Sequence, residues 1–207
     1  QSLELVSKAL LGSQQDGNPS PGTVVVLGSG AGRLAYDLHQ LLPFDVTVAV
    51  DFNPLLALVA ACTVSGTGTQ LWEFPIAPRS IGDHALLRTL VAPSPVRDGF
   101  HLLLADVLRP PLRPGSVDLV VTPWVVDILP ENFHAFAARV NGLLKPGGRW
   151  VNFGSLAFSQ PEAAARYSLE ETLAIVMDSG FAPPEAWEDD IPYMCSPASR
   201  HGRRELV

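Results

Sequence analysis

Three glycines alternate with other residues directly after a short apolar run near the start of the chain: Gly28, Gly30 and Gly32. A turn without side chains lets a ligand approach the backbone and meet the N–H groups that open the next helix. The dinucleotide fingerprint G-x-G-x-x-G requires glycine at position 33, where this chain has Arg33. The pattern is therefore G-x-G-x-G, and a tight turn needed only for packing is the alternative interpretation.

Two acidic residues follow these glycines, each at the end of an apolar run. Asp51 lies about twenty residues downstream, where a carboxylate can accept hydrogen bonds from both ribose hydroxyls. It predicts a nucleoside-like ligand without choosing the cofactor. Asp106 ends the run "HLLLAD", and a helix cap or a turn is its alternative role.

Strands and helices must position these residues, and the hydrophobic pattern predicts where they lie. Apolar runs predict buried strands over 23–28, 45–51, 101–106, 117–124 and 149–154. Helical spacing predicts helices over 3–11, 32–42, 53–65, 131–144 and 168–180. This alternation predicts a doubly wound, mostly parallel α/β sheet with helices on both faces. Ligands of such sheets bind beyond the carboxyl ends of the strands.

Length and composition indicate one domain. The 207 residues are 47% hydrophobic and carry a net charge of −7. We expect a single domain over 1–207, with an N-terminal helix and linker over 1–22 and an insert over 66–99. The scattered acidic charge argues against nucleic acid as a partner. We also expect no membrane span, no signal peptide, no metal site, free thiols at Cys62 and Cys195, and a cytoplasmic location.

Four landmarks occur in order along the chain: the turn "GSGAGR", Asp51, "LLLADV", and the segment from "VDLVVTPW" to "LLKPGGRWV". Together they resemble class I S-adenosylmethionine-dependent methyltransferases. The resemblance implies a seven-stranded Rossmann-like sheet and S-adenosylmethionine as cofactor. It implies these cofactor-binding residues: Gly28, Gly30, Gly32, Arg33, Asp51, Asn53, Asp106, Val107 and Thr122.

Two of these residues have roles that the resemblance makes specific. Asp106 would face the adenine amino group, a donor that an ionised carboxylate can accept from. Arg33 would pair with the cofactor carboxylate, and a solvated helix face is the alternative for this side chain.

Several segments narrow the resemblance: "GSGAGRLA", "PWVVDIL", "RWVNFGSL" and "IPYMCSPAS". They are similar to the carnosine N-methyltransferase family, which methylates an imidazole nitrogen. The resemblance places Asp127 at the family's aspartate and Tyr193 at a substrate position. Phe158 and Ser159 stand where the family tends to have Tyr-His.

Methyl transfer to nitrogen requires a neutral nucleophile and a site that tolerates charge moving from sulfur to nitrogen. An imidazole is mostly neutral at pH 7, so a carboxylate that fixes its tautomer is sufficient. Asp127 is the candidate for this role, and capping of the following helix is its alternative. The candidate catalytic residues are Asp127 and Tyr193, and the candidate substrate-binding residues are Trp124, Asp127, Asn152 and Tyr193. For Trp124, Asn152 and Tyr193, core packing or a satisfied hydrogen bond is the alternative.

The sequence therefore predicts an S-adenosylmethionine-dependent N-methyltransferase acting on a small imidazole or amine. A non-catalytic methyltransferase-like binding module is one alternative. A nicotinamide-dependent oxidoreductase is another, and Arg33 in place of the third fingerprint glycine counts against it.

Overall fold

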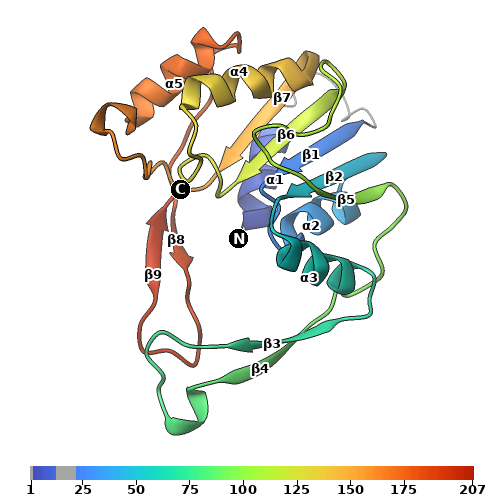
Figure 1. The fold of residues 1–207 in the computed structure, drawn as a ribbon, viewed down its shortest axis with the longest axis vertical. Coiled ribbons are helices and arrows are strands. Elements are labelled where there is room, and N and C mark those ends of the chain that lie inside the picture. Colours follow the sequence, from blue (N-terminus) through green and yellow to red (C-terminus); the bar gives the residue numbers. More distant parts are fainter. Residues whose placement is uncertain (1, 13–21) are drawn as a thin grey trace.

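Five parallel strands form the central sheet, in the order β5-β2-β1-β6-β7 (Figure 1). The computed structural model describes residues 2–12 and 22–207. The five strands are β1 (Thr23–Leu27), β2 (Val46–Asp51), β5 (Phe100–Leu104), β6 (Val117–Pro123) and β7 (Leu144–Phe153). They confirm the five strands predicted from the apolar runs and the parallel, doubly wound arrangement.

Helices cover both faces of this sheet. Figure 1 shows α1, α2 and α3 on one face and α4 and α5 on the other. Their bounds are α1 (Ser2–Gly12), α2 (Arg33–Leu41), α3 (Pro54–Val64), α4 (Phe133–Leu143) and α5 (Leu169–Asp178). Because β1 lies in the middle, its residues 24–27 are buried on both faces, which explains their continuous apolar run.

The helix starts follow the capping residues in the sequence. The Asn53 side chain accepts hydrogen bonds from the N–H groups of Leu55 and Leu56, and Pro54 occupies the first turn of α3. Ser168 and Glu171 form a reciprocal capping box at the start of α5. Asn and Ser are residue types that favour this position, so the local sequence explains where α3 and α5 begin.

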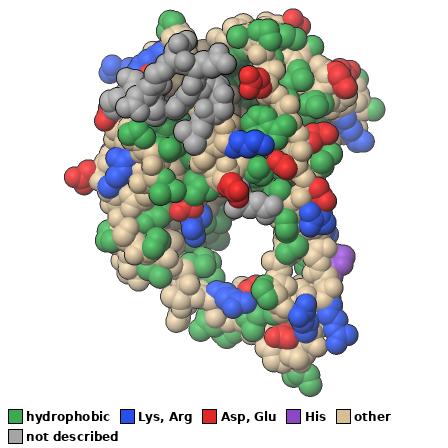
Figure 2. Space-filling model, turned by 180° about the vertical axis from the view of Figure 1, so that it is seen from behind, with side chains coloured by type: hydrophobic (Ala, Val, Ile, Leu, Met, Phe, Trp, Pro, Cys, Tyr) green, Lys and Arg blue, Asp and Glu red, His purple; other side chains and the backbone are tan. Residues whose placement is uncertain are grey.

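Two hairpins lie outside the sheet. The predicted insert over 66–99 contains β3 (Thr69–Glu73) and β4 (Leu86–Leu90), and the C-terminal part contains β8 (Asp190–Tyr193) and β9 (Arg203–Leu206). Their tips meet, because the Arg79 N–H donates to the Ala198 carbonyl and the Arg200 N–H donates to the Ala77 carbonyl. The two hairpins together, here called the arch, frame the opening visible in Figure 2.

The number of strands differs from the seven that the resemblance implies. Within the described residues, β8 and β9 pair with each other rather than with β7, so β7 is an edge of the sheet. The segment over 181–189 precedes β8 and forms no strand. Pro183 and Pro184 in this segment lack the N–H groups that a strand beside β7 would donate.

Four further expectations concern the N-terminal helix, the cysteines, membrane spans and metal sites. Helix α1 lies where the N-terminal helix over 3–11 was predicted, whereas most of the linker lies outside the described residues. Cys62 and Cys195 are both free thiols. In the parts of the chain that the structure describes, every helix is too short or too polar to cross a bilayer, and there is no cluster of metal-ligating side chains.

The capping box gives a test of how α5 is held. Replacing Ser168 by Ala leaves the Glu171 N–H without its side-chain acceptor and should lower the free energy of unfolding by about 1 kcal/mol. Urea unfolding followed by circular dichroism measures the change. The neighbouring exposed variant Glu170→Gln should change the free energy by less than about 0.5 kcal/mol. An equal loss in both variants would contradict the assigned cap.

Candidate active site

A cavity of about 830 Å³ opens at the carboxyl ends of the central strands. The strand order reverses at this place, since β1 lies between β2 and β6. An open α/β sheet binds its ligand at such a reversal. The lining includes residues 28–31 and 33 after β1, residues 51–53 after β2, residues 106–108 after β5, and residues 123–125 at the end of β6.

The glycine turn faces this cavity with its backbone. Gly28 and Gly30 have φ angles of 77° and 56°, which favour glycine. A Cβ atom at Gly28 would lie 2.9 Å from the Val125 side chain, whereas one at Gly30 would meet no atom within 4 Å. Gly28 is therefore required by packing, and Gly30 leaves open space on the cavity side. Gly32, the third predicted cofactor residue, is the N-terminal cap residue of α2 and does not line the cavity.

Asp51 connects the glycine turn to the next strand. Its Oδ2 accepts a 2.7 Å hydrogen bond from the Gly30 N–H, and its Oδ1 accepts a 2.9 Å bond from the Asn53 N–H. A carboxylate has about four acceptor positions, so two backbone donors leave room for ribose hydroxyls. The side chain predicted to hold a ribose thus also fixes the turn.

The residues after β5 form another part of the lining. The Asp106 Oδ1 accepts a hydrogen bond from the Leu108 N–H at 2.9 Å, so the turn role considered for this residue is present. Asp106 also lines the cavity, together with Val107 and with Asn53 from the α3 cap. Val107 is buried against the main apolar core. The structure therefore brings these three predicted cofactor residues to one cavity.

Arg33 lies on the rim of the cavity. Its side chain is 76% exposed, and its Nε donates to the Asp37 carboxylate at 2.6 Å, one helical turn along α2. An exposed pair of this type contributes little to stability. In this structure Arg33 thus lies on a solvated face of α2. Pairing of Arg33 with a cofactor carboxylate stays a prediction.

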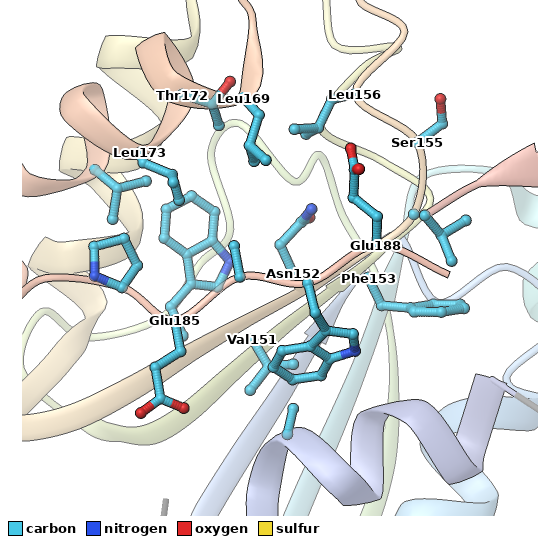
Figure 3. Close-up of a pocket in the computed structure, with 18 of the residues that line it drawn as sticks. Val151, Asn152, Phe153, Ser155, Leu156, Leu169, Thr172, Leu173, Glu185 and Glu188 are labelled. Carbon is cyan, nitrogen blue, oxygen red and sulfur yellow. The ribbon is translucent and has the colours of Figure 1, made fainter. Parts of the chain in front are cut away.

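Two of the predicted site residues, Thr122 and Asn152, do not line this cavity. Thr122 is fully buried; its hydroxyl accepts from the Trp150 Nε1–H and donates to the Asn152 Oδ1 at 2.8 Å. Asn152 lies in a second groove beside the edge strand β7, as Figure 3 shows. Their side chains point to the face covered by α4 and α5, because neighbouring residues of a strand alternate between faces. The geometry therefore does not support cofactor binding by Thr122 or acceptor binding by Asn152.

An aromatic pair stands at the end of β6. Trp124 lines the cavity and stacks on Tyr193 of β8 with a centroid separation of 4.8 Å and an interplanar angle of 28°. The φ angle of Trp124 is 53°, which is uncommon for a residue other than glycine. Such backbone strain persists where the surroundings hold it, and it clusters at functional sites. The structure thus brings together two predicted substrate residues that are far apart in the sequence.

Asp127 lies on the loop between β6 and α4, beside the cavity rather than among its lining residues. It does not cap α4, since Asn132 accepts the hydrogen bond from the His134 N–H. Burial raises the pKa of the Asp127 carboxyl, and the negative charge of Glu205 raises it further. Within residues 2–12 and 22–207, no Lys, Arg or His forms an ion pair with Asp127.

Comparison with known proteins identifies the fold. Residues 25–152 match the family described as "Methyltransferase domain". The chain belongs to this family. It is a class I methyltransferase domain, and S-adenosylmethionine is its methyl donor. The landmark order predicted from the sequence is confirmed at this level.

The individual relatives share little sequence with this methyltransferase domain. A carnosine N-methyltransferase from Drosophila melanogaster, named unmet, is 25% identical over 173 residues, which cover 75% of this chain and 37% of the relative. The chain thus spans little more than a third of that relative. The YcgJ protein from Bacillus subtilis has a TM-score of 0.63 and 14% identity, covering 93% of this chain and 73% of its own.

A third comparison shows how little the fold alone says of the acceptor. The geranyl diphosphate C-methyltransferase from Streptomyces coelicolor A3(2), solved with S-adenosyl-L-homocysteine, has a TM-score of 0.57 and 16% identity. It covers 92% of this chain and 59% of its own. A likeness at this level shows the fold alone, so the acceptor must be argued from the site.

The residues present fit the methyl donor. The cavity volume lies within the usual range of small-molecule sites. No side chain caps the N-terminus of α2, so its first N–H groups can receive a carboxylate. Asp51 would hold the ribose, and Asp106 with the apolar Val107 suits an adenine ring. The glycine turn, the Asp51 carboxylate and the apolar Val107 side chain all lie at this cavity.

The sequence did not single out Phe52 or Glu205. Phe52 follows Asp51, is 73% exposed, and lines the cavity, so an apolar residue directly after the ribose acid was a usable sequence signal. Glu205 lies on β9 near Asp127, and its position depends on the pairing of β8 with β9. No local pattern in the sequence indicates that pairing.

Removal of the Asp51 carboxylate tests the donor site. Asp51→Ala should weaken S-adenosylhomocysteine binding by roughly 1–3 kcal/mol, or about 5- to 150-fold, because the ribose and the Gly30 N–H both lose an acceptor. Isothermal titration calorimetry measures the affinity. Asp98→Ala, on an exposed loop away from the cavity, is the control and should bind as the wild type does. An unchanged affinity for Asp51→Ala would remove Asp51 from the site.

The raised pKa of Asp127 gives a prediction for stability. The folded state holds this proton more tightly than the unfolded chain, so the stability contribution is present at low pH and is lost as pH rises through the raised pKa. Asp127→Asn mimics the protonated form. The variant should melt about 1–3 °C higher than the wild type at pH 7. This difference in melting temperature should vanish below about pH 3.9, the usual pKa of an aspartate carboxyl in an unfolded chain.

Differential scanning calorimetry across this pH range measures the difference. The exposed variant Glu188→Gln should show no such pH-dependent gain. A lower melting temperature for Asp127→Asn at pH 7 would mean that the carboxylate makes a stabilising contact.

Proposed function

We propose that this domain is an S-adenosylmethionine-dependent N-methyltransferase whose acceptor is a small molecule with an imidazole or amine nitrogen. The observation that carries the proposal is the Asp127 carboxyl, half-buried and without an ion-pair partner in the described chain, on the loop that begins with Trp124. A partly buried carboxylate that lacks a protein cation suits an acceptor that gains positive charge. The similarity to a carnosine N-methyltransferase supports the same class of acceptor.

The methyl donor supplies an electrophilic methyl group on a sulfonium, and the acceptor nitrogen displaces it in line. In this proposal Trp124 and Tyr193 bind a planar acceptor ring at the mouth of the cavity. Asp127 accepts the N–H of the ring nitrogen that is not methylated, which orients the lone pair of the other nitrogen. The same carboxylate stabilises the positive charge that develops on the ring as the N–CH₃ bond forms.

A strong general base is not required in this scheme. The pKa of a free imidazole is near 6.5, so most of the acceptor is neutral at pH 7. The N–H proton of the methylated ring leaves through the Asp127 carboxylate to solvent. An amine acceptor would need the same carboxylate more, because its lone pair becomes available only after loss of a proton.

Ser159 lies next to this loop. Its N–H and its hydroxyl both donate to the Asp127 carbonyl, at 2.9 and 3.0 Å. The position where the carnosine N-methyltransferase family tends to have histidine therefore holds the loop that carries Asp127. The absence of that histidine favours a related acceptor rather than carnosine itself. A small-molecule acceptor and a cytoplasmic location are the corresponding expectations for the partner and the compartment.

The acceptor can be sought directly. The protein is incubated with S-adenosylmethionine labelled in the methyl group and with a metabolite extract, and the labelled product is identified by mass spectrometry. A label on an imidazole or amine nitrogen supports the proposal. A label only on oxygen, sulfur or carbon, or none while S-adenosylhomocysteine binds, contradicts it.

Asp127→Asn separates the acceptor role from the donor site. Turnover of the identified acceptor should fall by about 100-fold, because the amide cannot stabilise the cationic product. The affinity for S-adenosylhomocysteine should stay within about twofold of the wild type, since Asp127 lies outside the donor cavity. The control is Asp178→Asn, on the exposed end of α5. Normal turnover by Asp127→Asn would exclude Asp127 from the acceptor site.

A further inference from the structure

The loop after β6 is packed between the ends of the two strands beside it. Strand β6 lies between β1 and β7, and each of these neighbours is followed by a glycine, Gly28 and Gly154. A Cβ atom at Gly28 would lie 2.9 Å from the Val125 side chain. A Cβ atom at Gly154 would lie 3.0 Å from the Cα and N atoms of Trp124. The two glycines therefore contact consecutive residues of one loop, and neither position has room for a side chain.

Trp124 is held in an uncommon conformation at this place. Its φ angle of 53° lies in the left-handed region. Its N–H donates to the Phe153 carbonyl at 2.8 Å, and its indole lies edge-on to the Phe153 ring, with centroids 5.6 Å apart and an interplanar angle of 85°. The indole also stacks on Tyr193. These contacts fix the indole at the wall of the cavity.

A side chain at position 154 would disturb this arrangement. Its Cβ atom would lie 3.3 Å from the Trp124 Cδ2 atom, and the φ angle of 142° at Gly154 is one that residues with a side chain rarely adopt. The loop cannot move towards β1 to make room, because the buried Val125 already fills the space beside Gly28. The indole must move instead. Gly154 does not line the cavity, so its effect on a ligand passes through Trp124.

We infer that Gly154 is a positioning residue of the acceptor site: because it lacks a side chain, the Trp124 indole can lie between the cavity and Tyr193, where the acceptor ring binds. The inference rests on the proposed function for the place of the acceptor. The donor contacts described above come from the ends of β1, β2 and β5. Gly154 should therefore affect binding of the acceptor and not binding of the donor.

The position of Trp124 can be observed directly. The full chain is labelled with fluorotryptophan and loaded with S-adenosylhomocysteine, and the Trp124 signal in the fluorine NMR spectrum is assigned by its loss in Trp124→Phe. Gly154→Ala should shift this signal. The signals of Trp72 on β3 and Trp187 in the second groove should not move, because both side chains lie away from the loop.

Gly147→Ala is the matched control. Gly147 belongs to the same strand and has a φ angle of 79°, but a Cβ atom there would meet no atom within 4 Å. This variant carries backbone strain without a contact to Trp124, so its Trp124 signal should keep the wild-type position. An unmoved Trp124 signal in Gly154→Ala, or an equal shift in both variants, overturns the inference.

The effect on ligands is measured with imidazole, which is neutral at about pH 8.5. It is titrated into the protein loaded with S-adenosylhomocysteine, and binding is followed by ligand-observed NMR. Gly154→Ala should weaken imidazole binding by about 2- to 10-fold, the contribution of one aromatic contact. The affinity for S-adenosylhomocysteine should stay within about twofold of the wild type. General damage to the cavity would weaken both ligands, so an equal loss of both affinities contradicts the inference.

A double variant keeps the test valid if Gly154→Ala lowers stability. Trp124→Gly removes the indole and frees the backbone at position 124. In this background Gly154→Ala should lower the melting temperature by about 2–4 °C less than in the wild type. A folded double variant beside an unfolded Gly154→Ala supports the inference in the same way. Equal losses in the two backgrounds, including loss of folding in both, overturn it.

The proposed function can fail independently of this inference. If the Trp124 signal moves in Gly154→Ala but the wild type binds no imidazole and labels no imidazole or amine, the positioning of Trp124 stands and the N-methyltransferase proposal falls. If the wild type binds and labels imidazole but Gly154→Ala leaves the Trp124 signal and the imidazole affinity unchanged, the role of Gly154 falls and the proposed function stands.

Discussion

The hydrogen bond from the Gly30 N–H to the Asp51 carboxylate is the contact on which the donor side of the site depends. It joins the turn after β1 to the end of β2, two neighbouring strands whose parallel pairing brings both ends to one edge of the sheet. The same carboxylate holds the Asn53 N–H and so positions the start of α3. One acidic side chain therefore fixes the turn and the helix start, and still offers acceptors to a ligand.

The acceptor side is built differently. Its parts come from the loop after β6 and from the β8–β9 hairpin, which lie about seventy residues apart in the sequence. The Trp124–Tyr193 stack joins them at one end. At the other end the tips of the arch are tied together, where the Ala77 N–H donates to the Ser199 hydroxyl at 3.1 Å. The acceptor side thus depends on contacts between distant segments, whereas the donor side depends on neighbouring strand ends.

This difference explains what the sequence could and could not predict. The strands, the helices and their caps follow from local patterns, and the glycines with Asp51 and Asp106 follow from short spacings after strands. Thr122 and Asn152 show the limit of such spacing. A shift of one residue along a strand moves a side chain to the other face of the sheet. Which face Thr122 and Asn152 take depends on the register between β6 and β7. The arch and Glu205 depend on pairing between distant hairpins, for which the sequence carries no local pattern.

The loop from Trp124 to Asp127 combines two features that do not favour stability. Trp124 has a positive φ angle, and Gly154 must lack a side chain because a Cβ atom there would lie 3.0 Å from the Trp124 backbone. Asp127 keeps a carboxyl partly buried without a cation from the described chain, with Glu205 nearby. Packing alone would favour an apolar residue or an asparagine at that position. A carboxyl at this place suits an acceptor that gains positive charge as it is methylated, so the features of the loop that oppose stability are those that the proposed reaction uses.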